Sequence, residues 1–399
     1  MKNKICLINV KYSDNLGDGL ISERMEAELT RLAFDYIHLD LSGKSQYKRN
    51  IDVNKGSYKS RFLAWLMSFN ELAKYLLFLP NYLAGKKIVK KIKEPESITH
   101  VMIGGGHLFS DTGGYFPARL IAICRYLQKQ NPNIYFTTYG IGVSEHMSKF
   151  GIYAFNYLIK HTQISHFFVR DEVSKNNLEC LFNVLADVVL DPALITDNPP
   201  FSDKNSGQKV AIGIMSPSVL KAYGDDLYQR YDKDFYINLF LTFKALNYHC
   251  SFFTNGAFSD ELFLKEIYQT IGAKYQDCFQ ERFESPTALC DFIESQTLVL
   301  SHRLHANIIA FSKGVPSIGF PWDSKVSSFF LLSKRADFFI DCEQSNINTI
   351  VERAQLALQT PVANDEFLRK AKQQFMQALQ NENPLIEAES ESNAKIFSH

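Results

Sequence analysis

The sequence predicts an α/β protein with two domains, each built on a parallel β-sheet with helices on both faces. Two observations support this fold class. Short apolar runs of strand length alternate with longer amphipathic stretches, which is the rhythm of repeated strand–helix–strand units. The chain also has 399 residues, too many for one ordinary core, and a polar segment divides it near the middle.

Residues 1–196 form the predicted N-terminal domain. Strands are expected at residues 4–10, 36–41, 100–103, 134–139, 166–169 and 188–190. Amphipathic helices are expected between most of them, as at residues 20–33 and 117–130. This alternation predicts a Rossmann-type arrangement with a parallel sheet.

Residues 197–209, DNPPFSDKNSGQK, form the predicted linker because they are polar and rich in turn residues. The C-terminal domain is expected over residues 210–345, with strands at 210–215, 249–253, 297–300 and 315–320 and a helix at 305–313 that Gly314 ends. Residues 346–399 are expected to form C-terminal helices and a tail, with one exposed helix at 364–381 and a frayed end after Pro384.

Composition limits the function classes. The chain has 43 basic and 43 acidic residues, so its bulk charge excludes nucleic acid as an expected partner. Its seven cysteines are scattered and never spaced C-x-x-C, which predicts reduced thiols of a cytoplasmic protein and no zinc site. The apolar run after the first four residues is too short for a signal sequence. No metal-ligating cluster is visible, and no metal is expected.

Residues 44–94 break the pattern as a basic and aromatic insertion, with twelve Lys or Arg against three acidic residues. Residues 62–84 are rich in Leu, Phe, Trp and Tyr, but Asn70, Glu71, Lys74 and Pro80 interrupt them, so a membrane-spanning helix is not expected. One interpretation is a helix lying on an anionic membrane surface, which predicts a peripheral location on the inner face of the cell membrane. The other is a helical excursion packed on the first sheet.

Two loops of the N-terminal domain carry candidate site residues. Asn15, Gly17 and Asp18 follow the first strand, where Gly17 permits close backbone approach and the polar side chains can cap a helix or contact a ligand. Gly104, Gly105, Gly106 and His107, with Asp111 beyond, follow the third strand and offer bare backbone N–H groups to a phosphate or a sugar hydroxyl. Neither a dinucleotide fingerprint nor a Walker loop is present.

A third segment, SHRLHANIIAFSKGVPSIGFPWDSKV at residues 301–326, is a candidate anion site. Its cationic side chains Arg303, His305 and Lys325, with His302, cluster at the carboxyl end of a strand where a helix begins. Ligands bind at such ends in open α/β sheets, and a helix N-terminus favours anions. The alternative is that Arg303 and His305 only brace the turn.

Four blocks together resemble the polysaccharide pyruvyl transferase family. They are N-L-G-D at residues 15–18, G-G-G-H-L at 104–108 with a following Asp, V-R-D-E-V-S at 169–174 with a later D-P, and R-L-H at 303–305 followed by G-V-P and D-x-K. The resemblance spans residues 15 to about 326. It implies a GT-B-like fold of two facing Rossmann-type domains.

The resemblance also implies transfer of the enolpyruvyl group of phosphoenolpyruvate to two hydroxyls of a sugar, giving a pyruvate ketal and phosphate. It implies that the C-terminal domain binds the donor through Arg303 and His305, with Arg170 as a further donor contact. Lys325, from the cationic cluster above, is expected to contact the donor as well. The resemblance makes the N-terminal domain the acceptor side, with Asp18 near the acceptor. His107 departs from the small or amide residue that often follows the three glycines.

The chemistry suits these residue types, because arginine pairs with the phosphate and carboxylate of phosphoenolpyruvate. We expect His305 to act as the general acid and Asp18 as the base, with phosphoenolpyruvate as co-substrate and no cofactor required. The expected acceptor is a glycan or lipid-linked oligosaccharide of a bacterial surface polysaccharide.

The sequence is also compatible with two other functions. The first is a GT-B glycosyltransferase that uses a nucleotide sugar, although residues 301–340 contain no Glu of the kind that many retaining members use to hold the ribose. The second is a non-catalytic scaffold associated with the membrane, which predicts no anion bound at Arg303.

Overall fold

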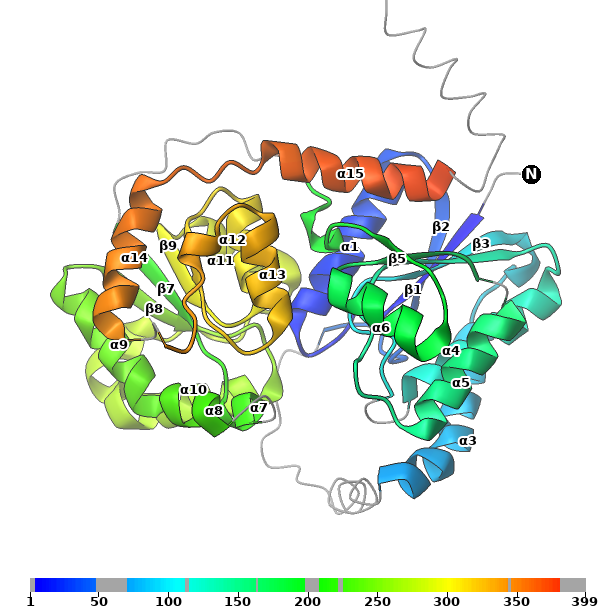
Figure 1. Cartoon of the computed structure of the whole chain (residues 1–399), viewed down its shortest axis with the longest axis horizontal. Coiled ribbons are helices and arrows are strands. Elements are labelled where there is room, and N and C mark those ends of the chain that lie inside the picture. Colours follow the sequence, from blue (N-terminus) through cyan, green and yellow to red (C-terminus); the bar gives the residue numbers. More distant parts are fainter. Residues whose placement is uncertain are drawn as a thin grey trace, which may run out of the picture.

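The computed structural model describes residues 4–47, 70–111, 115–162, 164–197, 208–221, 225–343 and 346–380. Within these ranges the chain forms two α/β domains that lie side by side (Figure 1). Most of the predicted linker, residues 48–69 of the basic insertion, and the tail after Pro384 lie outside the described residues.

Six parallel strands form the first sheet, in the order β2-β1-β3-β4-β5-β6. They are β1 (Lys4–Asn9), β2 (Asp35–Asp40), β3 (Ile98–Gly104), β4 (Tyr135–Ile141), β5 (Ile164–Val169) and β6 (Asp187–Val188). Its helices are α1 (Leu16–Arg31), α3 (Asn70–Val89), α4 (Tyr115–Gln130), α5 (Lys149–Thr162) and α6 (Glu172–Phe182). The strand order reverses between β1 and β3, where an open α/β sheet leaves a crevice at its carboxyl edge.

The second sheet repeats this arrangement with four parallel strands in the order β10-β9-β7-β8. The strands are β7 (Lys209–Gly213), β8 (His249–Phe253), β9 (Leu298–Ser301) and β10 (Ser317–Gly319). Its helices are α7 (Pro217–Leu220), α8 (Asp225–Arg230), α9 (Lys233–Ala245), α10 (Phe258–Tyr275), α11 (Pro286–Glu294), α12 (Leu304–Ser312), α13 (Ser324–Leu332) and α14 (Ile347–Gln359). The predicted α/β class with parallel sheets is confirmed.

Several element boundaries differ from the sequence expectation. Helix α1 begins at Leu16 instead of residue 20, because Asn15 has an extended backbone and its side chain accepts a hydrogen bond from the N–H of Gly17. Gly17 and Asp18 therefore belong to the first helical turn. Strand β6 has only two residues and β10 only three, because few backbone groups of the predicted runs pair with a neighbouring strand.

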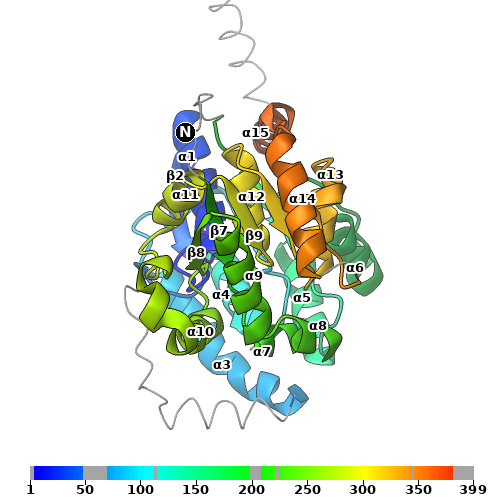
Figure 2. The ribbon, with the colours of Figure 1, turned by 90° about the vertical axis from the view of Figure 1, so that its left-hand side faces the viewer.

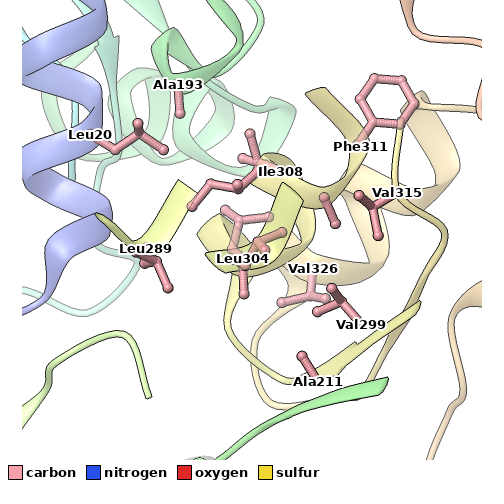
Figure 3. Close-up of a cluster of buried hydrophobic side chains, with 14 of the residues drawn as sticks. Leu20, Ala193, Ala211, Leu289, Val299, Leu304, Ile308, Phe311, Val315 and Val326 are labelled. Atoms are coloured by element: carbon pink, nitrogen blue, oxygen red, sulfur yellow. The ribbon is translucent and has the colours of Figure 1, made fainter. Parts of the chain in front are cut away.

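The two domains share one hydrophobic cluster. Leu20 of α1 and Ala193, from the 3-10 helix Pro192–Leu194, lie on the first-domain side, while Leu289, Leu304 and Ile308 face them from α11 and α12 (Figure 3). All five are buried. Burial of the apolar surface that both domains contribute stabilises their contact.

The C-terminal helix predicted at residues 364–381 is present, but the prediction that it is exposed is wrong for one of its faces. Helix α15 (Asp365–Gln380) lies across both domains in Figure 1 and buries Leu368, Ala371, Phe375, Ala378 and Leu379. The ring of Phe375 lies 4.9 Å from that of Tyr139 at the end of β4, centroid to centroid. The spacing of these apolar residues places them on one helical face, and the first domain supplies the surface that covers it.

Candidate active site

The domains meet where the first turn of α1 reaches the start of α12. The backbone N–H of Leu16 donates to the carbonyl of Asn255 in the second domain at 2.8 Å. A Cβ atom on Gly17 would lie only 2.1 Å from Nδ1 of His305. Since a side chain larger than hydrogen does not fit there, Gly17 permits direct contact between two predicted site segments, one from each domain.

His305 is buried and faces a carboxylate of the first domain. Its Nε2 lies 3.8 Å from Oδ2 of Asp191, and neither atom has a hydrogen-bond partner among the residues that the structure describes. Burial lowers the pKa of His305 below its ordinary value, while Asp191 and Asp18 act in the opposite direction. The imidazole is therefore neutral near pH 7 and has a carboxylate beside it to stabilise the protonated form.

Arg303 is held in place by a buried carboxylate. Its Nε and Nη2 donate to Oδ2 of Asp260 in α10 at 2.8 and 2.5 Å. Asp260 also accepts from the backbone N–H of Ser216 at 3.0 Å, so it joins the loop after β7 to the guanidinium. The side chain of Arg303 thus keeps one orientation at the carboxyl end of β9.

Lys325 lies in the first turn of α13 and shares an aromatic contact with Arg303. Its Nζ is 2.9 Å from Oδ2 of Asp323 and 4.4 Å from the ring centroid of Trp322. The guanidinium of Arg303 lies 5.5 Å from the same centroid. Trp322 therefore contacts both cations of the second domain.

Arg170 brings a third cation from the end of β5 in the first domain. It is buried, its Nε pairs with Asp171 at 3.2 Å, and its Nη2 lies 3.4 Å from Nδ1 of His107. Burial and then Arg170 lower the pKa of Lys325, so the two cations are close enough to repel each other across the interface. An anion bound between them would relieve this repulsion.

His107 has an exposed edge, and its Nε2 lies 2.8 Å from Oγ of Ser144. Desolvation by the surrounding protein, followed by Arg170 and Lys325, lowers its pKa to about 4. His107 is therefore neutral at physiological pH and presents its ring as a hydrogen-bonding group. It lines two cavities, one of about 630 Å³ shared with Trp322 and Asp323 and one of about 300 Å³ in the first domain.

The smaller cavity contains Asp18, Gly105, Gly106 and Tyr115 in its wall. Asp18 lies close to the glycine loop, because a Cβ on Gly106 would be 3.7 Å from its Oδ1. Burial and then Asp18 raise the pKa of Tyr115 to about 12, so this phenol keeps its proton. A carboxylate, a phenol and a glycine loop around a cavity of this size suit a polar ligand with several hydroxyls.

The family model of polysaccharide pyruvyl transferases matches residues 15–324 of the chain. The chain belongs to the polysaccharide pyruvyl transferase family. Membership makes it a transferase of polysaccharide synthesis with a glycan acceptor. The match includes every site residue described above except Lys325, which follows immediately. Among curated proteins, no sequence matches the chain.

Solved structures show that this transferase has a GT-B-like fold. The UDP-GlcNAc 2-epimerase of Methanocaldococcus jannaschii superposes with a TM-score of 0.53 at 12% identity, over 96% of this chain and 100% of the epimerase. The corresponding epimerase of Neisseria meningitidis has a TM-score of 0.47 at 13% identity, over 96% and 100%. The spinosyn rhamnosyltransferase SpnG has a TM-score of 0.45 at 11% identity, over 94% and 96%. At 12% identity, the likeness to the Methanocaldococcus jannaschii epimerase shows a shared fold and nothing about activity.

Some predicted site residues of the transferase occupy structural positions. A Cβ on Gly104 would meet the side chain of Met25 at 2.5 Å, so this glycine makes room for α1. Asp111 is buried, and its Oδ2 accepts hydrogen bonds from the backbone N–H and the hydroxyl of Ser148 before α5. His302 is buried with Nδ1 3.1 Å from the carbonyl oxygen of Pro321, and burial lowers its pKa to about 3.

Sequence reasoning gave no role to four residues of this arrangement, Asp191, Asp260, Trp322 and Tyr115. Asp191 is the Asp of the D-P in the third motif block, and Trp322 lies directly before the D-x-K of the fourth, so the blocks themselves pointed to these two. Asp260 lies 43 residues from Arg303 on another helix, and nothing in the local pattern marks it.

Proposed function

We propose that the protein transfers the enolpyruvyl group of phosphoenolpyruvate to two hydroxyls of a sugar and forms a pyruvate ketal. The observation that carries the proposal is that Arg170 from the first domain and Lys325 from the second line one cavity, with Arg303 beside Lys325 on the ring of Trp322. A donor with a phosphate and a carboxylate supplies the negative charges that such a cluster binds.

In the proposed reaction His305 protonates the methylene carbon of phosphoenolpyruvate, which becomes a methyl group. The first sugar hydroxyl bonds to the adjacent carbon and loses its proton to a base, for which we propose Asp18. Inorganic phosphate then leaves, and the second hydroxyl closes the ketal as it gives its proton to His305, which is thereby restored as the acid. A bound phosphate raises the pKa of His305, and Asp191 adds to this effect, so donor binding prepares the acid.

The acceptor belongs in the cavity lined by Asp18, Gly106, His107 and Tyr115, on the side of His305 that faces the first domain. We propose a sugar of a bacterial surface polysaccharide or of its lipid-linked precursor as this acceptor. Phosphoenolpyruvate is a co-substrate in this scheme, and the side chains named above supply the proton transfers without a cofactor.

The seven scattered cysteines of the sequence, never spaced C-x-x-C, support a cytoplasmic location within the proposal. Among the helices that the structure describes, none is long and apolar enough to cross a bilayer.

Phosphate release from phosphoenolpyruvate tests the proposed reaction. The purified protein is incubated with phosphoenolpyruvate and a panel of synthetic or lipid-linked glycans, and in parallel with a panel of nucleotide sugars. We expect phosphate release that depends on a glycan and a product heavier by the mass of a ketal-linked pyruvate. Transfer of a sugar from a nucleotide donor without use of phosphoenolpyruvate would instead establish the glycosyltransferase alternative.

A further inference from the structure

The outward side of α3 carries apolar side chains where a surface helix normally carries polar ones. Tyr75, Leu76, Leu79 and Leu83 are 55%, 57%, 61% and 48% exposed. At 100° per residue these four positions lie on one helical face. The opposite face packs on α4, and α3 lies at the lower border of the molecule in both views (Figures 1 and 2).

Helix α3 is not apolar on all sides, so a uniformly hydrophobic sequence does not explain why its leucines are exposed. Asn81, the one amide between residues 75 and 84, is directed inward. It accepts a hydrogen bond from Arg119 of α4 at 3.2 Å and donates to the carbonyl of Leu77 at 2.9 Å. The inward side of α3 buries Ile88 and Val89 and pairs this one amide, so the exposed leucines are apolar surface beyond what packing against the first domain requires.

The same face continues with exposed Lys86, Lys87 and Lys90, and Lys91 and Lys93 follow. Residues 75–93 contain no acidic residue. The face of Tyr75, Leu76, Leu79, Leu83, Lys86, Lys87 and Lys90, here named the α3 face, therefore joins an apolar half to a cationic half.

We propose that the α3 face binds the surface of an anionic phospholipid bilayer. Apolar side chains of such a helix enter the boundary between head groups and acyl chains, and lysines pair with phosphate groups. Charge complementarity favours this partner, because an anionic bilayer offers both an apolar layer and a plane of phosphates.

The helix that carries the α3 face adjoins the proposed acceptor side of the site through its opposite, inward side. Arg119 bonds Asn81 of α3, and its guanidinium lies 5.0 Å from the ring centroid of Tyr115, which lines the smaller cavity. A glycan linked to a membrane lipid would thus be presented on the side of the molecule where Asp18 lies. Bilayer binding itself does not depend on the proposed reaction and is measured without phosphoenolpyruvate.

Vesicle flotation tests the inference with the full chain. Wild-type protein is mixed at low salt with vesicles of phosphatidylcholine alone or of equal parts phosphatidylcholine and phosphatidylglycerol. We expect binding to the anionic vesicles only. Replacing Lys86, Lys87, Lys90 and Lys91 by Glu should weaken it by roughly a hundredfold or more, since each basic residue near such a surface contributes about a fivefold change. Leu79→Asp with Leu83→Asp should also release the protein.

Two control variants carry the same changes in charge and hydrophobicity at surface positions outside the α3 face. Lys265, Lys274, Lys334 and Lys370, all exposed and outside the α3 face, are replaced by Glu in one control, and the exposed Leu185 and Leu331 by Asp in another. Both controls should bind vesicles as the wild type does. Absence of wild-type binding at low salt would overturn the inference. So would an oligomer that Leu79→Asp dissociates while vesicle binding persists, because the leucines would then face a second protein chain.

Discussion

At the scale of single residues, Arg303 has a fixed orientation, and we propose that it binds the donor. Its two bonds to Asp260 use Nε and Nη2 of a planar guanidinium, and a lysine ammonium cannot make both. We expect Arg303→Lys to weaken phosphoenolpyruvate binding by about ten- to a hundredfold, the usual effect of losing one charge-assisted hydrogen bond. Titration calorimetry measures the change.

The control for this substitution is Arg335→Lys, which alters another buried arginine of the same domain away from the site. Arg335 donates to the carbonyl of Pro361 at 3.2 Å, so its replacement perturbs the fold without touching the cation cluster. Donor affinity should stay unchanged in Arg335→Lys. Equal affinities of wild type and Arg303→Lys would remove Arg303 from the donor site.

His305→Gln separates proton transfer from binding. Glutamine keeps a polar side chain in the buried position but cannot deliver a proton, so we expect donor binding to persist and turnover to fall by roughly a hundredfold or more. Steady-state kinetics and donor titration check both parts. If turnover survived and only the Michaelis constant rose, His305 would be a binding residue and the acid would lie elsewhere.

The pH dependence of activity follows from the lowered pKa of His305 in the unliganded protein. An acid must be protonated, so kcat/KM should fall as pH rises through a value below the ordinary histidine pKa. The limb of kcat should lie at higher pH, because bound phosphate favours the protonated ring. Asp191→Asn should move both limbs to lower pH, since Asp191 raises the pKa of His305. Profiles that do not move would contradict the pairing of Asp191 with His305.

At the scale of elements, α15 connects the two domains after the second sheet is complete. Besides the contact of Phe375 with Tyr139, Oε1 of Gln374 accepts a hydrogen bond from the N–H of Leu190 at 2.9 Å. The helix therefore depends on the first domain for both apolar and polar contacts, although it follows the second in sequence.

Phe375→Ala should lower the free energy of unfolding by about 3–5 kcal/mol, the usual range for truncating a buried phenylalanine. Lys370→Ala on the exposed side of the same helix is the control and should change it by less than about 0.5 kcal/mol. Urea denaturation measures both variants. Similar values for the two would mean that α15 does not stay docked in solution.

At the scale of the whole molecule, the proposed anion site needs both domains in place, because Arg170 and Lys325 come from different domains. An anion that binds the folded protein but not the unfolded chain increases the free energy of unfolding, and the increase grows with the anion concentration. We expect saturating phosphate or phosphoenolpyruvate to raise Tm. At a ligand concentration a hundred times the dissociation constant, the free energy of unfolding should increase by roughly 2.7 kcal/mol. Thermal unfolding measures this shift.

Chloride at equal ionic strength controls for screening in the same measurement and should leave Tm nearly unchanged. Lys325→Ala should lose most of the shift caused by phosphate while it retains the fold, since it removes the cation that lines one cavity with Arg170. A shift of wild-type size in Lys325→Ala would place the anion outside this cluster.

The sequence by itself determined the repeated strand–helix rhythm, the two parallel sheets and the four motif blocks, because hydrophobic period and turn residues act over a few neighbouring positions. The sequence also predicted that Arg303 and Lys325 follow the carboxyl ends of strands, and in the structure they follow β9 and β10. The family match then agrees with the order of these blocks.

Only the tertiary structure decided which distant groups meet. Asp191 and His305 lie 3.8 Å apart across the domain interface, and Asp260 of α10 bonds Arg303, which directly precedes α12. The apolar face of α15 packs on the first domain at Tyr139. On α3 the reverse holds, since leucines that local pattern assigns to packing remain exposed. Whether a side chain is paired, buried or exposed depends on surfaces brought together by folding, and local periodicity carries no information about which surface lies opposite.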